Sequence, residues 1–89
     1  MIIKRNPLIN SREAKDTLYV FDDKKMVLYT YSPVASFIWK ISQRPISLRD
    51  IVQRVCRKYD IDSQTAKKDI ELFIKGEIKT TKLFVPVND

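Results

Sequence analysis

The sequence predicts an α+β domain with a winged-helix-like architecture, in which an N-terminal antiparallel sheet of two or three strands is followed by three α-helices. Three observations predict this class. Segments rich in aromatic and β-branched residues precede residue 32, and three segments with the apolar spacing of helices follow it. The chain of 89 residues, 44% of them hydrophobic, suits a single domain over residues 1–89 with one modest core.

The strands are predicted from short runs of aromatic and β-branched residues. These runs are residues 17–22, residues 26–31 and a short last strand at residues 83–85. The polar stretch between the first two runs favours a turn, so we expect them to form a hairpin. A further first strand is expected near either residues 2–5 or residues 8–12. Pro86 would confine the last strand to the edge of a sheet.

The three helices are predicted from apolar stripes that follow capping residues. The stripes run over residues 34–41, residues 48–59 and residues 66–74, with the third extending toward Ile78. The capping signals are Ser32 before Pro33, Ser47 three residues before Asp50, and Asp62 or Ser63. We therefore expect short helices separated by tight breaks.

The composition argues against several classes of function. The chain has no histidine, one cysteine (Cys56) and one glycine (Gly76), so it lacks the usual general base, a cysteine-based zinc site and a glycine-rich phosphate loop. We therefore predict no catalytic residues, no metal ligands and no cofactor. No apolar run approaches the length of a membrane span, and the first residues do not form a signal peptide, so the cytoplasm is the expected location.

The order of several short motifs resembles the PqqD-like family, whose members recognise leader peptides during the biosynthesis of ribosomally made, post-translationally modified peptides. The motifs are Tyr-Thr-Tyr-Ser at 29–32, Ala-Ser-Phe-Ile-Trp at 35–39, Ser-Leu-Arg-Asp-Ile-Val at 47–52, Tyr-Asp-Ile-Asp at 59–62, and residues 66–74. The resemblance covers roughly residues 17–85. Glu77 stands where the family pattern has an apolar residue.

The resemblance implies a binding module that has no chemistry of its own. In such domains the leader lies as an added strand against the third strand of the N-terminal sheet, with the third helix as the other wall; main-chain groups give affinity and side-chain pockets give specificity. We expect the binding residues to be Met26, Val27, Leu28, Tyr29, Thr30, Tyr31, Lys67, Lys68, Glu71, Ile74 and Lys75. The two adjacent lysines would pair with acidic leader residues.

The implied partners are the precursor peptide and a separate enzyme, such as a radical SAM maturase or a leader peptidase. The precursor could belong to a quinone cofactor such as PQQ, a lasso peptide or another modified peptide. An exposed strand edge can equally pair with a second copy of the chain, so a homodimer is a further expectation.

The alternative function is that of a winged-helix protein that binds nucleic acid, which the net charge of +6 invites. The position of the charge argues against it. Residues 32–59 carry six basic and one acidic side chain, whereas residues 60–89 carry five basic and six acidic side chains. The third helix, which would enter the major groove, therefore lacks the basic excess that groove binding requires.

Overall fold

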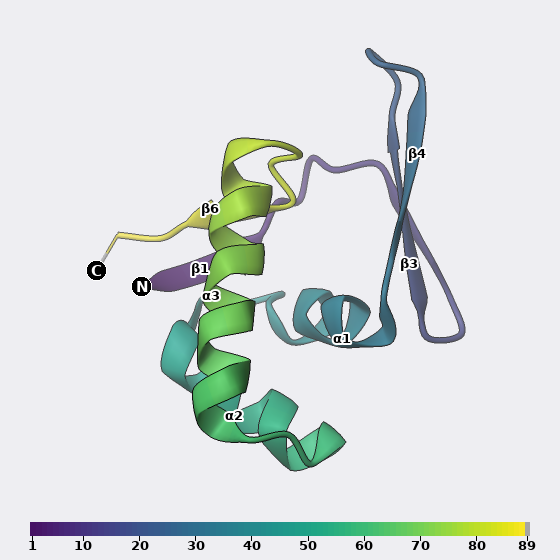
Figure 1. Cartoon of the computed structure of the whole chain (residues 1–89). Coiled ribbons are helices and arrows are strands. Elements are labelled where there is room, and N and C mark those ends of the chain that lie inside the picture. Colours follow the sequence, from purple (N-terminus) through teal and green to yellow (C-terminus); the bar gives the residue numbers. More distant parts are fainter. Residues whose placement is uncertain (89) are drawn as a thin grey trace.

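Within residues 1–88, which the computed structural model describes, two antiparallel sheets and three helices make up the fold and confirm the predicted α+β class. In chain order the elements are β1 (Ile2–Arg5), β2 (Ser11–Ala14), β3 (Thr17–Asp22), β4 (Val27–Tyr31), α1 (Pro33–Ile41), β5 (Ile46–Ser47), α2 (Leu48–Tyr59), α3 (Ser63–Lys79) and β6 (Phe84–Pro86). The sheet of β2, β3 and β4 stands to one side with α1 at its base, while β1 and β6 lie near α3 (Figure 1).

The turn between β3 and β4 is built by polar residues, as the sequence predicts. The Asp22 carboxylate accepts hydrogen bonds from the backbone N–H groups of Lys24 and Lys25, each at 3.1 Å. Met26 then takes a positive φ of 56°, which a residue other than glycine adopts mainly in turns. The strand begins at Val27, so the prediction that Met26 belongs to it is wrong by one residue.

The first strand of the chain belongs to a separate sheet. β1 lies between β5 and β6, and it pairs antiparallel with both. Of the two places predicted for a first strand, residues 2–5 are β1, and the second is shifted to residues 11–14, where β2 joins the hairpin. β6 is an edge strand, as predicted, but it runs over Phe84–Pro86 rather than residues 83–85, and β5 was not predicted.

Each of α1, α2 and α3 begins at a predicted capping residue. The side-chain oxygens of Ser32, Ser47 and Asp62 each accept a hydrogen bond from the backbone N–H three residues further on. Pro33 fills the first turn of α1, where its missing N–H costs nothing. α3 extends to Lys79, and no helix among the described residues is both long enough and apolar enough to cross a membrane.

The core forms where the helices meet β1, β3 and β6. Its buried members are Ile3, Leu18, Val20, Ile38, Trp39, Ile51, Val52, Val55, Ala66, Ile70, Ile74, Leu83 and Phe84. These side chains come from both sheets and from all three helices, so the burial of apolar surface holds the two sheets and the helices together.

A buried serine ties the second sheet to α1. The Ser36 hydroxyl accepts a hydrogen bond from the backbone N–H of Leu18 on β3 and donates one to the Ser32 carbonyl, both at 2.9 Å. Because Ser36 is only 2% exposed, breaking this link would leave a buried donor without a partner. The hydroxyl therefore fixes the position of β3 on α1.

Candidate functional site

One side of β4 has no strand beside it. The order of strands in this sheet is β2–β3–β4, so β3 is central and β4 hydrogen-bonds to β3 alone. The other side of β4 presents main-chain N–H and C=O groups without a strand partner. Such an edge is a ready template for another extended segment.

Alternation along the strands shows which main-chain groups face this edge. The backbone N–H of Phe21 donates to the Asn10 carbonyl at 3.0 Å, on the β2 side of β3. In an antiparallel sheet the main-chain groups of successive residues point alternately to the two sides. The main-chain N–H and C=O groups of Val20 therefore point toward β4. Val20 lies opposite Tyr29, so the main-chain groups of Tyr29 point toward β3.

Leu28 and Thr30, the neighbours of Tyr29, therefore turn their N–H and C=O groups away from β3. Both side chains are exposed, and Leu28 is 59% accessible. The rings of Tyr29 and Tyr31 are half-buried against the core instead. An extended peptide can thus hydrogen-bond to two residues of β4 without breaking the ladder that holds the sheet together.

A groove lies beside the end of this edge, between β4, α1 and α3. Its volume is about 310 Å³. Most of the side chains that line it are apolar or small: they are Thr30, Tyr31, Ser32, Val34, Ala35, Ile38, Asp69, Ile70 and Phe73. Among these, which all lie in the described part of the chain, Asp69 alone is charged. The groove can therefore accept an apolar side chain and places one carboxylate at its rim.

Tyr31 joins β4 to α3 at the closed end of this arrangement. Its ring meets Phe73 edge to face, with 6.2 Å between the ring centroids. Its hydroxyl donates a hydrogen bond of 2.5 Å to Oε1 of Glu77, and Thr81 donates a second hydrogen bond to the same oxygen at 3.0 Å. Glu77 therefore sets the separation of β4 and α3.

Burial, followed by the hydrogen bond to Glu77, raises the pKa of Tyr31 above its ordinary value of about 10. A group whose pKa rises on folding favours the protonated form in the folded protein. The neutral phenol therefore contributes stability that is complete below about pH 10 and is lost as the pH rises above that value.

Tyr31→Phe is expected to lower the free energy of unfolding by about 1 kcal/mol near neutral pH, because one hydrogen bond to Glu77 is lost. The difference between the two proteins should shrink above about pH 10, because there Tyr31 ionises in the unfolded wild-type chain and lowers its free energy, whereas the variant has no phenol at this position. Urea denaturation of both proteins on either side of that pH measures this. If the difference in the free energy of unfolding stays constant or grows with pH, the pKa of Tyr31 is not raised in the folded protein.

The structure places the predicted strand residues in different environments. Val27, Leu28 and Thr30 are exposed on β4, whereas Tyr29 and Tyr31 are half-buried. Met26 lies in the turn before the strand and is 75% exposed. The main chain from Val27 to Tyr31 is thus the part of the predicted strand that borders the edge.

The residues predicted on α3 do not form the wall of the groove. Ile74 has no exposed surface and does not line the groove, so it supports the helix from within the core. Lys67 lines a separate hollow with Leu48 and Arg49 at the start of α2. These contacts place the predicted flank of α3 on the side away from β4.

The other three predicted residues of α3 are absent from the lining of the groove as well. Glu71 and Lys75 form an ion pair of 2.7 Å along the helix, and this pairing lowers the pKa of the Glu71 carboxyl. Lys68 is exposed. The wall that faces β4 is made instead by Asp69, Ile70 and Phe73.

Sequence reasoning missed Asp69 and Phe73 as groove residues. Phe73 was assigned to the core stripe of the third helix, and it does touch the core residue Phe84 at 6.0 Å between ring centroids. Its other contact, with Tyr31, depends on which flank of the helix turns toward β4. The apolar spacing of one helix fixes its buried stripe but carries no signal for that choice.

The described residues contain no group of three or more potential metal ligands. The open strand edge and the apolar groove define the candidate site, an arrangement that can hold an extended peptide by its main chain and by one or two side chains.

Comparison with known proteins gives one family and one structure. The family described as coenzyme PQQ synthesis protein D (PqqD) matches residues 18–76, about two thirds of the chain. A structure described as TbiB1 in complex with the TbiA(beta) leader peptide aligns with a TM-score of 0.77 and 20% identity, over 97% of this chain and 99% of that chain. The curated proteins contain no significant match to the sequence.

The structural likeness extends over nearly the whole chain and shows that the two proteins share a fold, although their identity is low. The sequence match begins within β3, at Leu18, and covers β4, α1, α2 and most of α3, so it includes both walls of the groove. This match agrees with the order of motifs found in the sequence. The chain belongs to the PqqD family.

Proposed function

We propose that this protein binds the leader segment of a precursor peptide as an added strand on β4. The observation that carries the proposal is the unpaired edge of β4 beside an apolar groove. Membership of the PqqD family supports it. So does the shared fold with TbiB1, whose structure holds a leader peptide.

The groove gives the added strand its specificity. Alternate side chains of an extended peptide point to the same face, so one apolar side chain can enter between Tyr31 and Phe73. Asp69 lies at the rim and attracts a lysine or arginine of the peptide. We therefore expect a leader that carries a basic residue near its apolar anchor, rather than acidic residues that pair with Lys67 and Lys68.

The chemistry on the precursor belongs to a separate enzyme in this proposal. The groove offers apolar contacts and the single carboxylate of Asp69, which serve to hold a peptide rather than to cleave or modify it. The protein would act as an adaptor that presents the precursor to a radical SAM maturase or to a leader peptidase. The precursor would be that of a quinone cofactor, a lasso peptide or a related product.

A direct binding titration tests the proposal. The protein is added to a fluorescein-labelled leader peptide from the short precursor gene nearest to its own gene, and, in parallel, to labelled random duplex DNA. We expect saturable binding of the leader at micromolar or lower concentration, with little change as salt is raised. Main-chain hydrogen bonds and apolar contacts are much less sensitive to salt than contacts with phosphates.

Binding of DNA alone, with steep salt dependence, would contradict the proposal. It would assign the function to the exposed basic residues of α2, which are Arg49, Arg54 and Arg57. A sedimentation measurement on the free protein adds a second check. If the chain forms a stable dimer that binds no leader, and Thr30→Pro disrupts this dimer, a second copy occupies the edge of β4 and the leader does not.

A further inference from the structure

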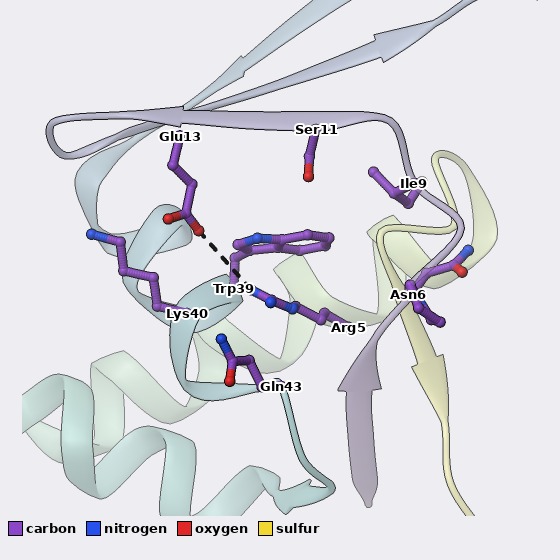
Figure 2. A pocket seen from close by; sticks show the side chains of 9 residues that line it. Arg5, Asn6, Ile9, Ser11, Glu13, Trp39, Lys40 and Gln43 are labelled. Atoms are coloured by element: carbon purple, nitrogen blue, oxygen red, sulfur yellow. Dashed lines mark ion pairs between the residues drawn. The ribbon is translucent and has the colours of Figure 1, made fainter.

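A second hollow lies at the opposite edge of the same sheet. It is formed by β1, β2 and α1, has a volume of about 490 Å³, and includes Arg5, Ser11, Glu13, Trp39 and Lys40 in its lining. Figure 2 shows Ser11 and Glu13 reaching from β2 toward the Trp39 ring, with Arg5 against the ring and Lys40 to one side. This hollow, the Arg5 pocket, shares no lining residue with the groove beside β4.

The guanidinium of Arg5 is held in place but is only partly neutralised. Its central carbon lies 4.9 Å from the centroid of the Trp39 ring, a cation–π contact that fixes its orientation. The nearest carboxylate oxygen, on Glu13, is 4.0 Å away, beyond hydrogen-bond distance. Among the described residues, the Arg5 side chain makes no hydrogen bond, so its donors can serve a second carboxylate.

The charges around the pocket favour an acidic ligand. Arg5 and the exposed Lys40 supply two positive charges, and Glu13 supplies one negative charge. The Arg5 side chain is 27% exposed and the Glu13 side chain 39% exposed, so both are reachable from solvent. A carboxylate that enters the pocket is therefore attracted by Arg5 and Lys40, and it competes with Glu13 for the Arg5 guanidinium.

The strand above the pocket is the second edge of its sheet. All four residues of β2 are exposed, and β2 pairs with β3 only. The hydrogen bond from the Phe21 N–H to the Asn10 carbonyl shows that the main-chain groups of Asn10 point toward β3. By alternation, those of Ser11 and Glu13 point outward. The same two residues direct their side chains into the pocket (Figure 2).

We propose that the edge of β2 and the Arg5 pocket together form a second peptide-binding site, which takes an extended acidic segment of a partner protein. The segment adds to β2 through the outward main-chain groups of Ser11 and Glu13, and one of its carboxylates reaches Arg5 and Lys40. This second site lies on the opposite edge of the sheet from β4. A partner protein and a second peptide can therefore be bound at the same time.

The charge of the Arg5 pocket favours an acidic segment as its ligand. Arg5 and Lys40 outnumber Glu13, so the pocket keeps one unmatched positive charge, which an acidic side chain of the incoming strand can neutralise. The short strand and its charged residues discourage indiscriminate pairing, so a complementary segment is favoured over a generic one.

Trp39 provides the measurement because it is the single tryptophan of the sequence and lies against Arg5. The probe is a blocked peptide of about eight residues, long enough to cover a strand, in which Glu alternates with Thr. The control peptide carries Lys in place of Glu. We expect the Glu peptide to change the emission of Trp39 saturably, up to millimolar concentration, and the Lys peptide to leave it unchanged.

Three charge variants make the prediction specific. Lys40→Gln is expected to weaken binding of the Glu peptide about two- to fivefold, as for a partly exposed ion pair. Glu13→Gln is expected to strengthen it by a similar factor, because a competing carboxylate is removed. Lys75→Gln on α3 is the matched control and should leave the affinity unchanged, since Lys75 pairs with Glu71 on the far helix.

Ser11→Pro tests the contribution of the strand edge. It removes an outward N–H of β2, which a sheet edge tolerates, and should abolish binding while circular dichroism shows a folded protein. Equal responses to the Glu and Lys peptides, or Lys40→Gln and Glu13→Gln shifting affinity in the same direction, would overturn the proposal. Dimerisation through β2 would also overturn it. None of these outcomes depends on leader binding, because the probe contains no leader sequence.

Discussion

Thr30→Pro is expected to abolish binding of a leader peptide while the protein remains folded. The main-chain N–H of Thr30 points away from β3, so a proline ring at this position removes a donor from the open edge without removing one from the ladder. The lost hydrogen bond and the added ring should weaken binding at least about tenfold. The labelled-leader titration measures the loss.

Tyr29→Pro, one residue earlier, is the matched control. Tyr29 lies opposite Val20 and bonds to β3, so proline there removes a ladder hydrogen bond and should destabilise the sheet by about 2 kcal/mol or more. Thr30→Val separates the loss of the side chain from the loss of the N–H. If Thr30→Pro binds leader as tightly as Thr30→Val does, the added strand does not lie on this edge.

Phe84→Ala is expected to lower the free energy of unfolding by about 3–5 kcal/mol. Phe84 is 1% exposed, and its ring lies between Trp39 of α1 and Phe73 of α3, with centroid distances of 6.5 Å and 6.0 Å. A domain of this size has a total stability of about 4–13 kcal/mol. The substitution should therefore remove much of the stability and, through Phe73, disturb the groove.

Urea denaturation compares Phe84→Ala with Leu8→Ala. Leu8 is 90% exposed, so its truncation should change the free energy of unfolding by less than about 0.5 kcal/mol. Because Phe84 lies outside the residues that match the PqqD family, the comparison also tests whether β6 is part of the essential core. Similar small losses in both variants would show that β6 is dispensable.

Local signals in the sequence predict local structure well here. The caps at Ser32, Ser47 and Asp62 are each formed within three residues, so the information that sets them lies in adjacent positions. The hairpin turn at Asp22 is equally local. These features fix where helices and strands begin, and with them the order of elements that confirms the α+β class.

The pairings between segments that are distant in the chain could not be predicted from the sequence. β1 pairs with Ile46–Ser47 and with Phe84–Pro86, segments some forty and eighty residues away along the chain. β5 has two residues, too few for a periodic pattern to mark it as a strand. Its place is set by β1, which it joins through the pairing of Ile2 with Ser47.

In the candidate site, too, local features could be predicted from the sequence, whereas features that depend on the packing of distant segments could not. The edge strand could be predicted because residues 26–31 have a strand composition, and the resemblance to the PqqD-like family implies that a leader adds to this strand. The wall on α3 could not be predicted, because Asp69 and Lys67 lie on opposite flanks of one buried stripe. Only the packing of the helix decides which of these flanks faces β4. Glu77 looked like a departure from the family pattern, yet it is the partner of Tyr31.

Amide hydrogen exchange, with and without the leader peptide, tests the central claim most directly. In the free protein the amides of Leu28 and Thr30 face outward and should exchange fast, while that of Tyr29 is protected by its bond to β3. The account predicts that the leader peptide protects Leu28 and Thr30 strongly and leaves Ser11 and Glu13 of β2 unchanged. Protection that appears on β2 or on α2 instead, with Leu28 and Thr30 still exchanging fast, would contradict it.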